Sequence, residues 1–197
     1  MSTRQRIGAV AAPAVLVSMI PVFRFLEATL GSRRAWIAGI FVYWAVWCVT
    51  LPMLILGWRG AKRLFERGRM TWLAWLVVTM PPLVSLIGRF FGIRQSIYTL
   101  AISIPLALLN GVMEELLWRG VFTGLFPDSV FWGVLWPSFW FGLWHFAPAS
   151  VNRTPYEAVQ LVAAAMFLGL AMGWVAHSSS SIRWTAFSHA LAGALRM

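Results

Sequence analysis

The sequence predicts an all-α fold, a polytopic bundle of transmembrane helices. Of its 197 residues, 60% are hydrophobic and only 11% are charged, whereas soluble chains carry about 25% charged residues. The mean hydropathy of +0.75 points the same way, because a soluble domain of this length cannot hide so much apolar surface. The apolar residues also run continuously, which is typical of helical spans and not of the alternating strands of a β-barrel.

Seven apolar runs predict the individual helices. A hydrocarbon core of about 30 Å needs roughly 20 residues per span, so we expect about seven spans, with six or eight left open. The runs cover residues 7–30, 35–58, 71–92, 97–126, 129–147, 156–177 and 182–197. The breaks at 31–34, 59–69, 92–95, 127–128, 148–155 and 178–183 each combine charge, Pro, Gly or Ser, as expected of loops that leave the membrane.

The first run also has the basic start of a signal peptide. Arg4 and Arg6 precede it, but the run continues to Phe25 without a convincing cleavage site, which favours an uncleaved first span. No low-complexity linker interrupts the chain, so we expect one integrated membrane domain.

The net charge of +10 is explained by topology, because the basic residues stand mostly at the ends of apolar runs. This distribution gives no reason to expect a nucleic-acid partner. With the N-terminus in the cytoplasm, eight basic residues lie on that side: Arg4, Arg6, Arg59, Lys62, Arg63, Arg67, Arg69 and Arg183. Five lie on the other: Arg33, Arg34, Arg94, Arg153 and Arg196. We therefore predict a multi-pass protein of the cell (inner) membrane with a cytoplasmic N-terminus, surrounded by membrane lipid as its partner.

Ionisable residues inside a span cost several kcal/mol unless they are paired, so they indicate function by default. Several have structural explanations. Arg24 and Glu27 are three residues apart and can pair, Arg89 can snorkel from the end of its run, and His177 adjoins a serine-rich break. Five remain: Glu114, Glu115, Arg119, His145 and His189.

The two adjacent glutamates face different directions. Glu115 and Arg119 are four residues apart with the acid first, the favourable order for an ion pair on one helix face. Glu114 is rotated by about 100° from Glu115, and its neighbour one turn earlier is Asn110. The pattern predicts that Glu115 is neutralised while Glu114 has no local cation, as suits a general base. The structural alternative is a packing cluster in which both acids are merely satisfied.

Two histidines complete the candidate site. The ring of Phe141, four residues before His145, can pack beside the imidazole. His189 lies in a run of small residues that permits close helix approach. Either histidine alone would more often be a packing residue, but with Glu114 they place three chemically capable side chains on three separate spans.

These motifs resemble the CPBP family of intramembrane proteases, also called Abi, which includes the CAAX prenyl endopeptidases. The resemblance rests on Glu114-Glu115-x-x-x-Arg119, Phe141-x-x-x-His145 and the late His189, and it covers about residues 97–197. It implies that residues 97–197 form a catalytic helical core and that residues 1–96 are N-terminal scaffold helices. It further implies an endopeptidase acting on a membrane-associated or C-terminally processed peptide or protein, in which Glu114 and His145 activate water and His189 stabilises the carbonyl or oxyanion.

One position departs from the family pattern. Members usually have Asn or Asp four residues after the last histidine, where this chain has Gly193. An oxyanion donor is worth about 3–4 kcal/mol of barrier, so another group has to replace it. Asn110 is the best candidate, and Ser188 is a weaker one.

The chemistry of the site leaves one alternative open. Glu114, His145 and His189 could hold a zinc ion with an open position, but the His-Glu-x-x-His spacing on one helix is missing. We favour metal-free, glutamic-type hydrolysis without a cofactor and keep zinc as the alternative. Cys48 is the only cysteine, so neither an internal disulfide nor a multi-cysteine metal site is expected.

Two other functions compete with proteolysis. A catalytically altered member could act as a peptide-binding or immunity protein, which Gly193 favours. A proton-coupled carrier could use Glu114 and the histidines as a relay, but the two halves show no repeat or pair of broken helices.

Overall fold

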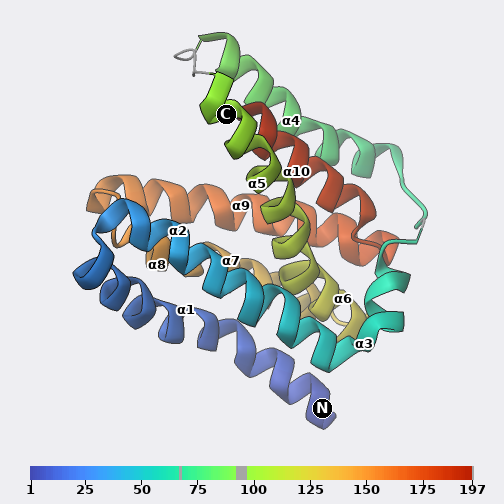
Figure 1. The fold of residues 1–197 in the computed structure, drawn as a ribbon. Coiled ribbons are helices and arrows are strands. Elements are labelled where there is room, and N and C mark those ends of the chain that lie inside the picture. Colours follow the sequence, from blue (N-terminus) through green and yellow to red (C-terminus); the bar gives the residue numbers. More distant parts are fainter. Residues whose placement is uncertain (67, 92–96, 197) are drawn as a thin grey trace.

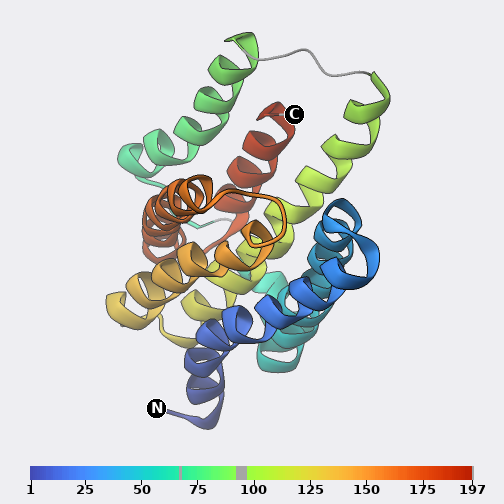
Figure 2. The ribbon, with the colours of Figure 1, turned by 90° about the vertical axis from the view of Figure 1, so that its left-hand side faces the viewer.

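The fold is a bundle of helices in a computed structural model that describes residues 1–66, 68–91 and 97–196. A long helical hairpin begins it: α1 (Thr3–Leu30) turns at Gly31 into a second arm, which consists of α2 (Ser32–Tyr43), the π-helix η1 (Trp44–Thr50) and α3 (Leu51–Leu64) and has a kink at Gly57. Gly31 adopts a φ of 76°, a backbone conformation that favours glycine, and this allows the reversal. Next to the turn, α1 and α2 lie side by side (Figures 1 and 2).

The remaining helices follow the predicted runs closely. They are α4 (Trp72–Phe91), α5 (Ile97–Glu115), η2 (Leu116–Val121), α6 (Phe122–Leu125), η3 (Phe131–Leu135), α7 (Trp136–Trp144), α8 (Phe146–Ala149), α9 (Pro155–Ser179) and α10 (Arg183–Arg196). The described residues contain no strand, and the predicted all-α fold class is confirmed.

Two groups of helices meet along α5. In one group α7 packs between α1 and α9, and in the other α10 packs between α4 and α5. Figure 1 shows α5 descending from the second group across the first, so that its C-terminal end and η2 enter the main core. That core is rich in aromatic side chains, with Phe23, Trp118 and Trp144 almost completely buried. The polar residues of α5 therefore lie where the two groups join.

Prolines inside helices leave carbonyl groups without their usual donors, and at two of them a side chain from another helix binds the carbonyl. Pro13 cannot donate to the carbonyl of Ala9, which instead accepts a hydrogen bond from Nε1 of Trp136 at 3.0 Å. Pro82 likewise leaves the carbonyl of Val78 free, and the hydroxyl of Ser188 donates to it at 2.6 Å. These bonds tie α1 to α7 and α4 to α10.

The number of spans stays a prediction. Within the described parts of the chain, four helices are long and apolar enough to cross a membrane: Thr3–Leu30, Ser32–Leu64, Trp72–Phe90 and Pro155–Ser179. Among the other helices, α10 has 14 residues, which corresponds to about 21 Å at 1.5 Å per residue and is shorter than the hydrocarbon core.

The expected loop at 59–69 is wrong in its first half, because the helix continues to Leu64. Gly57 interrupts it with a non-helical φ of 68°, so the apolar part ends where predicted and a short basic helix follows. Alternation of apolar and basic residues explains the helix, since Ala61 and Leu64 are buried while Lys62 and Arg63 are exposed.

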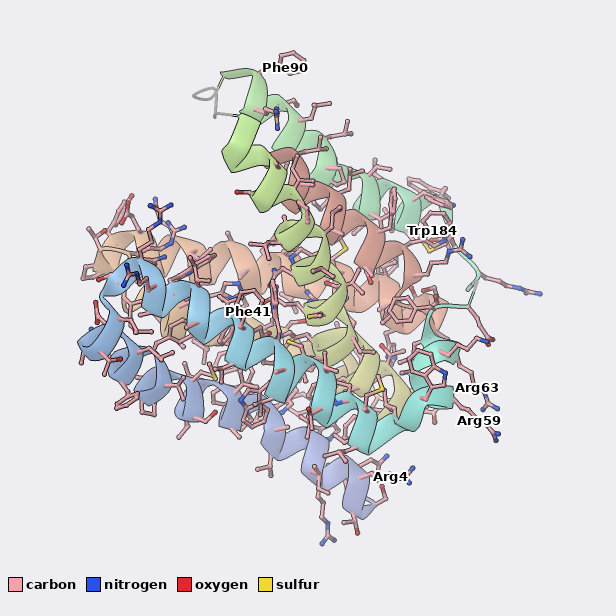
Figure 3. The ribbon with its side chains drawn as sticks, in the orientation of Figure 1. Arg4, Phe41, Arg59, Arg63, Phe90 and Trp184 are labelled. Atoms are coloured by element: carbon pink, nitrogen blue, oxygen red, sulfur yellow. The ribbon has the colours of Figure 1, made fainter. Side chains whose placement is uncertain are left out.

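Three of the basic residues predicted for the cytoplasmic side lie at one end of the molecule. Arg4, Arg59 and Arg63 project from the lower right in Figure 3, while Phe90 lies at the top. The turn at Gly31 lies at the opposite end of the hairpin from the N-terminus (Figure 1). Arg67 and Arg94, together with the rest of the predicted break at 92–95, lie outside the described residues.

Candidate active site

The close approach of α5 and α10 creates the candidate site. At Gly111, a Cβ atom would lie 2.4 Å from the backbone nitrogen of Ala190, a distance that no other residue type could accept without movement of the backbone. The glycine therefore lets the two helices touch, and it brings His189 beside Glu114 and Glu115. After Glu115 the helix changes to the π-helix η2, a local insertion that is frequent at functional sites.

Glu115 is a completely buried carboxylate with a partner on each of two helices. Its Oε1 lies 2.9 Å from Nη1 of Arg119, the predicted pair, and 3.1 Å from Nδ1 of His189. The contact with Arg119 is electrostatic and is not an aligned hydrogen bond. The guanidinium also lies 4.3 Å from the centroid of the Phe141 ring. Glu115 thus neutralises Arg119 and holds the ring of His189.

Among the described residues, Glu114 forms no ion pair with a cation of its own helix, since Arg119 pairs with Glu115 as predicted. It is 4% exposed, and its Oε2 accepts a hydrogen bond from Nδ2 of Asn110 at 3.1 Å. The same oxygen faces Nε2 of His189 at 3.7 Å. Glu114 is therefore a buried carboxylate held by one neutral donor and one histidine.

His145 ends α7 with its ring orientation set by the backbone. Nδ1 lies 2.7 Å from the carbonyl oxygen of Phe141, and because a carbonyl only accepts, Nδ1 carries the hydrogen in this bond. The neutral ring then has its lone pair on Nε2. The ring of Phe141 stands edge-on to both His145 and His189, with centroids 4.9 and 6.3 Å away.

The spacing of possible metal ligands bears on the zinc alternative. No group of three His, Cys, Asp or Glu side chains among residues 1–66, 68–91 and 97–196 is spaced to hold one ion. The predicted zinc ligands Glu114, His145 and His189 therefore do not fit a preformed three-ligand centre, and we derive no step through a metal.

The comparison with protein families covers the same part of the chain. The model for the family described as type II CAAX prenyl endopeptidase Rce1-like matches residues 96–195, about half of the protein. The chain belongs to this family. No curated protein and no solved structure matches it. Membership of this family indicates, at family level, a CAAX-type intramembrane protease. This agrees with the resemblance seen in the motifs.

In this Rce1-like chain, Gly193 faces α5. A Cβ atom there would lie 3.3 Å from Cβ of Ala107, one turn before Asn110 and Gly111. The position therefore points toward the seam of α5 and α10 but supplies no polar atom. Ser188, the weaker replacement, is engaged with the carbonyl of Val78 on α4. Asn110 keeps one amide hydrogen beyond the one it donates to Glu114.

The scaffold half also contributes to the site of this family member, which sequence reasoning missed. Nε1 of Trp44 donates to Oδ1 of Asn110 at 2.8 Å. The hydroxyl of Tyr43 accepts from Nε1 of Trp118 at 2.7 Å, and its ring stacks on Trp144 at 3.8 Å. The only signal in the sequence was an aromatic side chain with a polar tip inside an apolar run, which usually finds a partner when buried. Thirteen tryptophans make that signal unspecific.

Proposed function

We propose that this protein is a glutamic-type intramembrane endopeptidase, which hydrolyses a peptide bond in a membrane-associated or C-terminally processed substrate. The main support is the pair of unequal glutamates. Glu115 pairs with Arg119 and with Nδ1 of His189, while Glu114 forms no described ion pair within its helix and faces Nε2 of the same histidine. The arrangement separates a supporting carboxylate from one suited to proton transfer.

In the proposed reaction, Glu114 and Nε2 of His145 orient a water molecule, and Glu114 takes its proton as the oxygen attacks the scissile carbonyl. His189, when both ring nitrogens carry hydrogen, donates from Nε2 to the developing oxyanion while Glu115 holds Nδ1. Asn110 supplies a second donor with its remaining amide hydrogen. Glu114 then gives its proton to the peptide nitrogen, the C–N bond breaks, and the carboxyl and amine products leave.

The test uses purified protein in liposomes and a fluorescence-quenched peptide carrying a farnesylated cysteine four residues from its C-terminus. A non-prenylated copy serves as the second substrate. We expect cleavage by the wild type, and a loss of at least roughly 10²-fold in Glu114→Gln and His145→Ala, because each removes a group that orients or deprotonates water. Glu27→Gln, which alters an exposed ion pair with Arg24, is the matched control and should remain active. Full activity in both site variants would refute the assigned roles.

Chelation distinguishes the two types of hydrolysis. A glutamic-type enzyme keeps its activity in EDTA and after dialysis, since none of its steps uses a metal. Loss of cleavage in EDTA that Zn²⁺ restores would instead support the metallopeptidase alternative, with Glu114, His145 and His189 as ligands.

Gly193 favours a second candidate function, that of a peptide-binding or immunity protein. Such a protein would bind a peptide in the same site without hydrolysing it. Such a protein would need the shape of the site but not its proton transfer. If Glu114→Gln binds or protects as well as the wild type, and the wild type cleaves neither peptide, this second function is the better account.

The membrane topology and the partners of the protein belong to the proposed function. We infer that the protein crosses the cell (inner) membrane several times with its N-terminus in the cytoplasm and that its substrate is a peptide or protein. Membrane lipid is the other partner. The chain's basic clusters and four long apolar helices support this arrangement.

A further inference from the structure

Trp44 begins a hydrogen-bond chain that ends on the proposed catalytic carboxylate. Its indole nitrogen donates to Oδ1 of Asn110 at 2.8 Å, and Nδ2 of Asn110 donates to Oε2 of Glu114 at 3.1 Å. Trp44 is 6% exposed and belongs to η1, outside the residues 96–195 that match the family. A residue of the scaffold thus acts on the site through one amide.

The direction of the chain follows from the chemistry of its first member. An indole N–H only donates, so the amide atom that it meets has to be the oxygen, and Nδ2 has to face Glu114. An ionised Glu114 selects the same orientation of the amide. A protonated Glu114 does not, because its O–H is itself a donor and an amide oxygen would accept it.

We propose that Trp44 is a positioning residue that keeps the Asn110 amide in one orientation while Glu114 is protonated during turnover. This inference rests on the proposed role of Glu114 as the general base. With Trp44 in place, the proton that Glu114 takes from water stays free to move to the leaving nitrogen, and the C–N bond can break. Without the indole N–H, the amide turns, Oδ1 accepts the Glu114 proton, and the donor to the oxyanion is lost as well.

The surroundings of Trp44 hold its indole in place. The ring of Phe41 stands edge-on to it with centroids 5.3 Å apart, and the preceding residue, Tyr43, stacks on Trp144 of another helix. Trp44 is also the first residue of the π-helix η1, a type of insertion that is frequent at functional sites. The donor is therefore fixed by packing before any substrate binds.

The first experiment compares Trp44→Phe with the wild type and with Trp140→Phe, using the quenched farnesylated peptide. Phenylalanine keeps an aromatic ring but removes the N–H. Trp140 is a matched control because its buried indole nitrogen has no partner among the described residues. We expect kcat of Trp44→Phe to fall roughly tenfold, as for an impaired proton transfer, with KM unchanged, and both constants of Trp140→Phe to stay at the wild-type values.

A double-mutant cycle separates positioning from packing. If Trp44 acts through the amide, Trp44→Phe should cost nothing further in an Asn110→Ala background. If Trp44→Phe lowers kcat equally in the wild-type and the Asn110→Ala backgrounds, the inference is overturned. It is also overturned if the wild type is active and a folded Trp44→Phe variant has the same kcat. A wild type that cleaves neither peptide would instead overturn the proposed function, on which this inference rests.

A spectroscopic measurement keeps the inference testable if Trp44→Phe does not fold. In protein labelled with ¹⁵N at the tryptophan indoles, Asn110→Ala should shift the Trp44 resonance and leave that of Trp140 in place, because only Trp44 loses its acceptor. An unchanged Trp44 resonance would overturn the inference.

Discussion

At the scale of single residues, contacts within one helix could be predicted from the sequence, whereas contacts between helices could not. The ion pair of Glu115 with Arg119 and the hydrogen bond of Asn110 to Glu114 each join residues four apart, and helix geometry alone predicts them. The contacts of Glu115 with His189 and of Trp44 with Asn110 join residues 74 and 66 apart. Nothing in the periodicity of one helix specifies which residue of another will meet it, so these contacts required the structure.

The residue-scale prediction concerns Gly193→Asn. A missing oxyanion donor costs about 10²–10³ in kcat, so a site that truly lacked one would gain by that factor. If Asn110 already supplies the donor, we expect kcat to rise by less than roughly tenfold, measured with the quenched farnesylated peptide. The added Cβ would lie 3.3 Å from that of Ala107, a tight but adjustable contact, so Gly193→Ala is the control for crowding alone. A gain of roughly 10²-fold or more in Gly193→Asn relative to Gly193→Ala would contradict the role of Asn110.

At the scale of elements, the apolar runs predicted the helices because a membrane span has to be continuous and of fixed length. The departures have separate physical reasons. A π-helix inserts one residue without altering hydropathy, so η1 and η2 leave no trace in the pattern. The basic helix after Gly57 combines apolar and charged residues over barely two turns. Its dense charge is typical of a loop, which is why the sequence predicted one there.

The element-scale prediction is that Gly111→Ala separates α5 from α10. The new Cβ would approach the backbone nitrogen and Cα of Ala190 to 2.4 and 2.5 Å, and backbone atoms cannot rotate away as a side chain can. We expect cleavage to fall by at least roughly tenfold because His189 moves from the glutamates, and thermal unfolding in detergent to occur at lower temperature because overpacking costs about 1–3 kcal/mol.

Gly88→Ala is the control for this substitution. Beyond its own helix backbone and chain neighbours, no atom of the described residues lies within 4 Å of a Cβ at Gly88, which is on α4. Alanine favours a helix over glycine by about 1 kcal/mol. This variant should be as active and at least as stable as the wild type. If Gly111→Ala behaves in the same way, the close approach at Ala190 is not what assembles the site.

At the scale of the whole molecule, the family match covers only the second half of the chain, but the candidate site also includes contacts from the first half. Residues 96–195 carry every motif residue, whereas the orientation of Asn110 depends on Trp44 in the preceding half. The prediction that residues 1–96 are scaffold rests on their lack of motifs. It does not account for the contact that Trp44 makes with the site. Motifs identify groups that react, and they omit apolar residues whose single polar atom positions such a group.

Orientation in the membrane belongs to this largest scale, and Cys48 makes it measurable. As the only cysteine, and a completely buried one, it can be replaced by alanine to give a background without thiols. Cysteines are then introduced singly at exposed positions of the two ends: Arg4→Cys and Arg63→Cys at one, Arg34→Cys and Arg153→Cys at the other.

A membrane-impermeant maleimide applied to intact spheroplasts should label the Arg34→Cys and Arg153→Cys variants and reach the other two only after permeabilisation. The reason is the positive-inside rule, by which the dense basic segment at 59–69 and the N-terminal arginines stay in the cytoplasm. All four positions must label in detergent, which controls for reactivity. The reverse pattern would place the N-terminus outside, and labelling of Arg4→Cys and Arg63→Cys from opposite sides would contradict the hairpin of α1 with α2, η1 and α3.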